Sequence, residues 1–152
     1  MRLINLISLL YYNFVMNEMY SMGLDLHSIG AGAILAIIFL NLFILISYND
    51  LKKYKRISSI FLQPLTFTTL GLVIFTGVIM MAAKHLDFTF ANIVMIVISI
   101  IYIMLEVKRI KSLRYLNDKK DHAFNAYKPI ARTILQVEFL MVVIISIWMW
   151  LL

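Results

Sequence analysis

Two histidines are the first residues in this sequence whose placement could support chemistry. His27 lies at the start of one long charge-free stretch and His85 lies just after the next, so both should face the same side of a membrane. Two imidazoles on different helices at equal depth are the arrangement that binds a b-type haem between apolar walls. The pair therefore predicts a haem b site. The alternative is that each ring simply reaches toward the lipid headgroups.

Methionines gather on the same predicted side as the two histidines. Met16, Met19 and Met22 recur at three-residue intervals. Met80 and Met81 lie one helical turn before the second histidine. Thioether sulfur is a soft ligand that suits Cu(I), so these five residues are candidate copper ligands. The competing interpretation is that flexible methionine side chains fill gaps between helices.

A third candidate is Glu138, the one charged residue in an otherwise apolar C-terminal stretch. A charged carboxylate in hydrocarbon costs about 3 kcal/mol on insertion scales, so we expect Glu138 to face protein and to be neutral if no cation reaches it. A packed carboxylic acid, a docking contact for another subunit and a proton relay are its alternative roles. Candidate hydrogen-bond partners are the polar side chains of the predicted helices: Gln136, Asn41, Thr66, Thr68, Thr69 and Asn92.

The composition places these candidates in a membrane. The chain has 152 residues, of which 62% are apolar and 14% are charged, and its mean hydropathy is +0.90. A soluble domain has about 45–50% apolar and about 25% charged residues, so a cytoplasmic enzyme domain is excluded. The absence of cysteine excludes disulfides, thiolate metal sites and cysteine nucleophiles. The protein is predicted to be embedded in a lipid bilayer.

Four stretches are long and apolar enough to cross the bilayer. They are residues 26–49, 57–83, 88–105 and 133–152. Because a span needs about 20 apolar residues and backbone groups cannot go unpaired in lipid, each stretch is predicted to be a helix. The predicted fold is therefore an all-α, integral membrane four-helix bundle at residues 26–152, preceded by an N-terminal segment at residues 1–25.

Basic residues predict the orientation of this bundle. The loop at residues 49–56 carries four basic residues against one acidic, and the loop at residues 106–132 carries eight against three. The positive-inside rule places both loops in the cytoplasm and the C-terminus outside, in what we expect is a bacterial inner membrane. Apolar positions continue the third helix outward to about Asn117. Its basic residues favour anchoring to anionic headgroups over nucleic-acid binding, because all of them sit against the membrane.

The N-terminal segment contains a shorter apolar run at residues 3–17. At 1.5 Å per residue this run spans about 22 Å, less than a hydrocarbon core of about 30 Å. Its polar residues recur at helical spacing, which favours a helix lying in the outer interface. A fifth, short spanning helix is the alternative, because Arg2 inside with Glu18 and Asp25 outside obeys the charge rule. A cleaved signal peptide is disfavoured, since no small-x-small cleavage site follows.

Small residues in the first span predict a close helix contact. Gly30, Gly32 and Ala36 would let another backbone approach, and close packing is the usual compensation for glycine, which costs about 1 kcal/mol relative to alanine in a helix. We expect these three residues to face a neighbouring helix. A membrane-protein partner or a second copy of the chain is also expected.

Several residues occur in an order known from one family. Leu26-His27 opens the first span, Gln63-Pro64 lies early in the second, and Arg132 opens the fourth. This order resembles the four-helix membrane protoporphyrinogen oxidases and the related copper-resistance D-type proteins. The resemblance implies that His27 contacts haem. The family's lysine early in the third helix would fall near Asn92, and its Asn-Glu after the fourth-helix arginine is Leu135-Gln136 here, which argues against the oxidase reaction.

Two functions from different classes remain. In the first, the protein binds haem or a metal, with His27 as the main ligand and His85 or an outer methionine as the second. In the second, it is a non-catalytic accessory subunit of a larger membrane complex. A pump or channel is not expected, because only Glu138 and a few amides are available to line a path.

Overall fold

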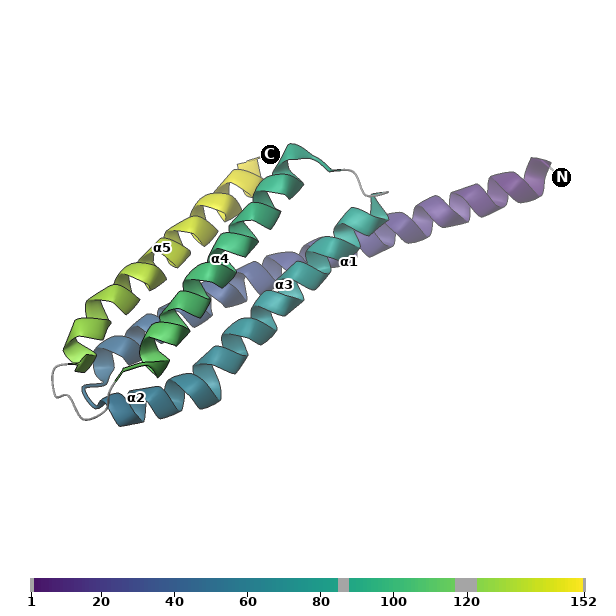
Figure 1. The fold of residues 1–152 in the computed structure, drawn as a ribbon. Helices are drawn as coiled ribbons and strands as arrows, with labels where there is room; N and C mark the ends of the chain where they lie inside the picture. Colours follow the sequence, from purple (N-terminus) through teal and green to yellow (C-terminus); the bar gives the residue numbers. More distant parts are fainter. Residues whose placement is uncertain (1, 85–87, 117–122, 152) are drawn as a thin grey trace.

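The described part of the chain is almost entirely helical and forms a long, open bundle (Figure 1). The structure is a computed structural model that describes residues 2–84, 88–116 and 123–151, with side chains from residue 11 onward. Its elements are α1 (Arg2–Ser47), α2 (Leu51–Ile57), the π-helix η1 (Ser58–Leu62), α3 (Gln63–Ala83), α4 (Phe90–Arg114) and α5 (Ala123–Leu151). Four helical stretches are long and apolar enough to cross a membrane. The predicted all-α membrane fold is confirmed.

Local signals in the sequence explain where these helices begin and bend. The Asp50 side chain accepts the backbone N–H of Lys52 at 2.9 Å and caps α2. Thr89 caps α4 in the same way. Pro64 has no N–H to donate four residues back, and the chain just before it widens into the π-helix η1. The turn of α2 away from α3 in Figure 1 lies at this point.

The long helices pack around α1 and α5. Helix α1 lies along α3 and α5, and α4 lies along α5. The end of the bundle that contains α2, the last turns of α4 and the first turns of α5 is called the α2 end below, and the opposite end is called the far end (Figure 1). At the α2 end, Lys55 donates to the Leu116 carbonyl at 2.9 Å and Lys128 donates to Asn49 at 3.0 Å. These bonds tie α2 and the loop before it to the rest of the bundle.

Helix α1 does not break between the predicted N-terminal segment and the first span. It runs without interruption from Arg2 to Ser47 and projects beyond the other helices at the far end (Figure 1). The run at residues 3–17 is therefore part of the first helix, and its place at the membrane interface stays a prediction. With 46 residues, α1 is about 69 Å long. Part of it must therefore lie outside a hydrocarbon core of about 30 Å.

Two helices extend further than the charge-free stretches did. Helix α4 continues past residue 105 to Arg114, as predicted, and α5 begins at Ala123, ahead of the predicted start at residue 133. Much of the predicted cytoplasmic loop at residues 106–132 is therefore helical. The charge-free criterion missed these turns because a helix keeps its charged residues at the membrane surface or pairs them inside the bundle.

Candidate functional site

Glu106 and Arg109 form an ion pair inside the bundle, one turn apart on α4. Arg109 donates from Nε to Oε2 of Glu106 at 2.8 Å and from Nη2 to Oε1 at 2.6 Å. Both residues are at most 1% exposed. Two parallel bonds of this kind are the strong form of an arginine–carboxylate contact. Sequence reasoning counted both residues among the charges at the membrane surface, which is wrong. Their i, i+3 spacing at the end of an apolar stretch was the signal for a pair.

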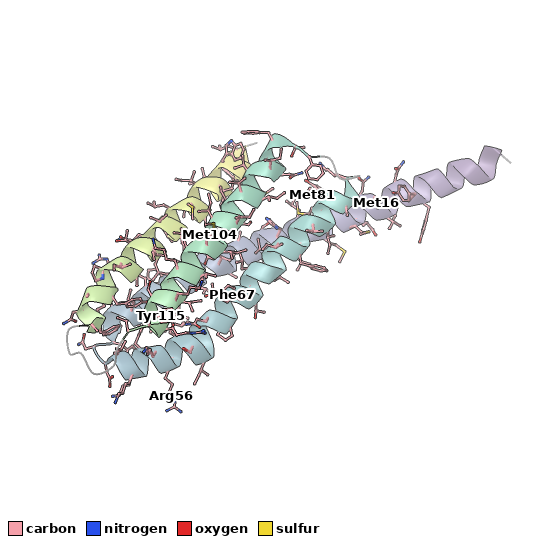
Figure 2. The ribbon with its side chains drawn as sticks, in the orientation of Figure 1. Met16, Arg56, Phe67, Met81, Met104 and Tyr115 are labelled. Carbon is pink, nitrogen blue, oxygen red and sulfur yellow. The ribbon has the colours of Figure 1, made fainter. Side chains whose placement is uncertain are left out.

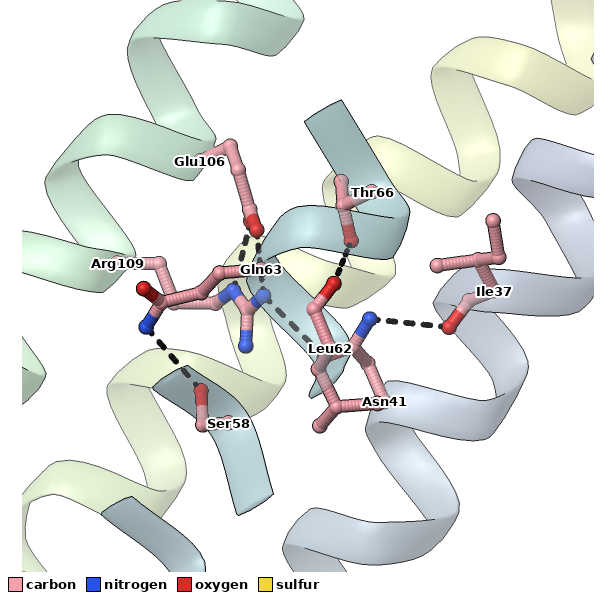
Figure 3. A network of polar contacts seen from close by, with 8 residues as sticks. All are labelled: Ile37, Asn41, Ser58, Leu62, Gln63, Thr66, Glu106 and Arg109. Atoms are coloured by element: carbon pink, nitrogen blue, oxygen red, sulfur yellow. Dashed lines mark hydrogen bonds and ion pairs between the residues drawn. The ribbon is translucent and has the colours of Figure 1, made fainter. Parts of the chain in front are cut away.

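Asn41 of α1 joins this pair from across the bundle. Arg109 donates from Nη2 to the Asn41 side-chain oxygen at 3.3 Å, and the Asn41 amide donates to the Ile37 carbonyl at 3.0 Å (Figure 3). Asn41 is 1% exposed. The Asn41 oxygen therefore serves Arg109 and its amide nitrogen serves its own helix. Asn41 does not bond Glu138, contrary to what the sequence suggested, because the Glu138 oxygens have no partner among the described residues.

Polar groups of η1 and α3 surround the ion pair but bond within their own segment. The Gln63 amide donates to the Ser58 hydroxyl at 3.3 Å, and the Thr66 hydroxyl donates to the Leu62 carbonyl at 2.9 Å (Figure 3). Ser58 and Thr66 are both buried. These bonds occupy the polar side chains of η1 and α3 without adding a charge, so Arg109 is held by Glu106 and Asn41 and not by these groups.

Glu138 lies inside the bundle, near the middle of α5, and is 0% exposed. Neither of its carboxyl oxygens has a hydrogen-bond partner among the described residues. It lies within electrostatic range of Glu106 and Arg109, and of Tyr102 on α4.

None of the six polar side chains considered as partners bonds Glu138. Gln136 and Thr68 are exposed, Thr69 and Asn92 are half-buried, and Asn41 and Thr66 bond elsewhere. Gln136 cannot reach Glu138, because residues two apart on a helix point in nearly opposite directions, about 160° apart. Glu138 is therefore an acid buried in protein without the partner that its burial calls for.

Two buried tyrosines flank the ion pair on its α2 side. Tyr54 of α2 is 0% exposed and Tyr127 of α5 is 3% exposed, with ring centroids 6.2 Å apart. Phe124 packs on Tyr54 at a centroid distance of 5.3 Å. Neither hydroxyl completes a short hydrogen bond with a described residue, but the two hydroxyls interact with each other, and Tyr54 also interacts with Arg109. Sequence reasoning missed these tyrosines, since nothing in a single sequence says which loop tyrosine will fold inward.

His27 has a different environment, in the contact between α1 and α3. Its Nδ1 lies 3.1 Å from both the Val73 carbonyl and the Thr76 hydroxyl. The Thr76 hydroxyl is itself within donating distance of backbone carbonyls of α3. Both groups facing Nδ1 therefore act as acceptors, which assigns the ring proton to Nδ1. A Cβ on Gly77 would lie 3.5 Å from the ring, so His27 packs directly on α3.

The predicted partner of His27 lies outside the described residues. His85 is not among them, so the histidine pair stays a prediction. The described residues contain no group of three or more His, Cys, Asp or Glu side chains that could hold a metal ion. What the structure provides at this end is one imidazole with its Nδ1 already bonded.

The candidate copper ligands are spread over the far end of the molecule. Met19 and Met22 are exposed, and Met16, Met80 and Met81 are half-buried. Figure 2 shows Met16 on the projecting part of α1 and Met81 at the end of α3. A Cβ on Gly23 would come within 2.8 Å of Met80 Cγ, so Met80 fills the space between α1 and α3. The copper site stays a prediction.

The small residues of α1 divide between two faces. A Cβ on Gly30 would lie 2.6 Å from Val73 Cγ2, so this glycine allows the close approach of α1 to α3. Gly32 has nothing within 4 Å of such a Cβ, and Ala36 is exposed. For packing within the chain, the expectation for these two residues is wrong. At about 100° per residue, Gly32 and Ala36 point away from the side of α1 on which Gly30 contacts α3.

No protein-family model, curated protein or solved structure matches the chain. The resemblance to the membrane protoporphyrinogen oxidases and copper-resistance D-type proteins therefore stays a prediction. Of the residues that carry it, His27 bonds α3, Gln63 bonds Ser58, and Arg132 is exposed near the start of α5.

Proposed function

We propose that the protein transfers protons in the membrane, with Glu138 as the group that takes up and releases the proton. The observation that carries this proposal is the position of Glu138, which is fully buried near the middle of a predicted span and has no hydrogen-bond partner in the part of the chain that the structure describes. Ionisable groups in membrane interiors are costly, and they typically mark a proton or ion path.

The neighbours of Glu138 explain why a proton is the natural ligand. Glu106 and Glu138 share a single guanidinium, that of Arg109. With both carboxyl groups ionised, the cluster carries a net negative charge in a low-dielectric interior, and one proton makes it neutral. The other titratable group in range is Tyr102. The buried polar residues that α1 and α3 contribute nearby, Asn41 and Thr66, carry no charge.

Arg109 also offers a way to couple the proton to a movement. In the observed state it bonds Glu106 twice and Asn41 of α1 once. When Glu138 loses its proton, two carboxylates compete for the same guanidinium. A shift of Arg109 toward Glu138 would weaken its bond to Asn41 and so change the contact between α1 and α4.

Infrared spectroscopy of the full chain in lipid tests this proposal. A protonated carboxyl group in an apolar setting has a carbonyl stretch that is separate from the carboxylate bands. We expect this band near neutral pH in the unaltered protein and in Glu18→Gln, an exposed control, and we expect Glu138→Gln to lack it. We also expect the band to appear and disappear reversibly as the pH is cycled, because Glu138 takes up and releases the proton. A missing band in the unaltered protein would overturn the proposal.

A haem or metal site at His27 is the second candidate function. The observation that favours it is the bond of Nδ1 to the Val73 carbonyl, because histidines that bind metals typically donate their second ring nitrogen in this way and keep Nε2 free. His85 or an outer methionine would supply the second ligand. Bound haem would add one-electron chemistry. We expect a Soret band in protein purified from its native membrane and its loss in His27→Ala. A colourless, metal-free preparation would argue against this site.

The orientation and the assembly state complete the proposal. We place the α2 end in the cytoplasm of a bacterial inner membrane, because this end carries most of the exposed basic residues. The non-catalytic accessory subunit remains the alternative to proton transfer. Its signature would be co-purification with a larger membrane complex that tolerates Glu138→Gln without loss of activity.

A further inference from the structure

We propose that protons reach Glu138 from the α2 end alone, along internal water molecules held by the hydroxyls of Tyr54 and Tyr127. The inference rests on the proposed role of Glu138 and adds a route and a direction to it. A series of buried polar groups points to this route, because it begins with Tyr54 of α2 and ends at Glu138.

The first step is the incomplete hydrogen bonding of three buried groups. Neither Glu138 oxygen has a hydrogen-bond partner among the described residues. The Tyr54 and Tyr127 hydroxyls complete no short hydrogen bond there, although they interact with each other and Tyr54 interacts with Arg109. Leaving a buried polar group unpaired costs about 1–3 kcal/mol. Proteins typically meet this need with buried water, which makes about three hydrogen bonds to polar groups that would otherwise be unsatisfied.

The second step is the order of these groups along the bundle. Tyr127 lies in the second turn of α5, about 6 Å along the helix from its first residue, and Glu138 lies about 16 Å further on. Arg109 is within electrostatic range of both tyrosines and of Glu138. Water between the hydroxyls and the ion pair would therefore connect the α2 end to Glu138.

The third step is that the buried side chains between Glu138 and the far end are mainly apolar. Among the described residues, the buried side chain of α5 that follows Glu138 toward the far end is Val142. No buried residue of α4 lies closer to the far end than Tyr102. The remaining buried polar side chain toward the far end, Thr76, bonds His27 in the contact between α1 and α3. Among the described residues of α4 and α5, no fully buried polar side chain continues the path toward the far end. Ser99 and Ser146 are only half-buried, and Ser99 donates to the Met95 carbonyl of its own helix.

The test follows the protonated-carboxyl band of Glu138 after a pH jump on one side of vesicles with known protein orientation. We expect the band to respond to pH at the α2 side and not to pH at the far side. The double variant Tyr54→Phe/Tyr127→Phe keeps both rings and removes both hydroxyls. We expect it to slow the response about tenfold or more, because the water chain loses two of its hydrogen-bonding anchors. Tyr115→Phe makes the same change on a side chain that is 81% exposed and should keep the original rate.

Two outcomes would overturn this route. One is a band that follows pH at the far side, and the other is an unchanged rate in the double variant. The single variant Tyr127→Phe provides the same comparison if the double variant does not fold, as judged by its thermal unfolding. Failure of the proposed function looks different, because the band itself would then be missing from the unaltered protein.

Discussion

Arg109 of α4 donates a hydrogen bond of 3.3 Å to Asn41 of α1, a residue 68 positions away in the sequence. The same guanidinium holds Glu106 with two shorter bonds. One buried cation therefore links the first and third predicted spans and fixes the acid beside Glu138. Removing Arg109 should therefore destabilise the fold more when Glu106 stays charged than when Glu106 is removed as well.

We predict that Arg109→Met lowers the free energy of unfolding by about 3–5 kcal/mol, because Glu106 is left buried without its partner. The double variant Arg109→Met/Glu106→Met removes both charges and should recover most of this loss. Arg56→Met is a control on an exposed arginine. Unfolding in detergent measures all three. Equal losses in the single and double variants would contradict the assigned pair.

We predict that Asn41→Leu costs about 1 kcal/mol, in the range measured for polar contacts between membrane helices. The physical reason is the loss of the bond to Arg109 together with the bond to the Ile37 carbonyl. A double-mutant cycle with Arg109→Met separates the two bonds, because only the first should disappear when Arg109 is already gone. Strictly additive losses would show that Asn41 and Arg109 do not interact.

The apolar stretches predict the fold well because hydrophobicity decides which segments enter the bilayer. They place the four spans and the extension of the third helix beyond residue 105. They fail at the ends of α1 and α5, where the helix continues through polar residues. Helix propensity and neighbouring helices decide such ends, and a charge-free stretch measures neither.

The candidate site is less predictable than the fold. Glu138 stands out in the sequence because a lone acid in an apolar stretch is costly. Glu106 and Arg109 do not, because they adjoin a basic segment and resemble surface charges. Only the rotation of α4 about its axis separates them from exposed Lys108 and Lys111, and that rotation depends on contacts between helices.

We predict opposite results for two glycines of α1. Gly30→Leu should destabilise the bundle by about 1–3 kcal/mol, because its side chain would collide with Val73 of α3. Gly32→Leu is the matched control, since a Cβ there meets nothing within 4 Å. Thermal unfolding in detergent compares them. If Gly32→Leu leaves the fold intact but changes the size of the purified particle, Gly32 faces another chain.

We predict that Lys111→Cys and Asp25→Cys are labelled from opposite sides of the membrane. Both residues are exposed, the first near the α2 end of α4 and the second near the far end of the bundle. The chain has no cysteine of its own, so each variant carries a single reactive thiol. In intact cells an impermeant thiol reagent should label Asp25→Cys only. Labelling of Lys111→Cys instead would reverse the orientation.

We predict that the two buried glutamates respond differently to the same substitution. Glu106→Met leaves Arg109 buried without its carboxylate and should destabilise the protein by about 3–5 kcal/mol. Glu138→Met removes a carboxyl group that has no hydrogen-bond partner, so we expect stability to be unchanged or to rise by about 1 kcal/mol. The protonated-carboxyl band should nevertheless disappear in Glu138→Met, because the group that takes up the proton is gone. A large loss of stability in Glu138→Met would contradict this prediction, because it would show that Glu138 is an essential packing or pairing group.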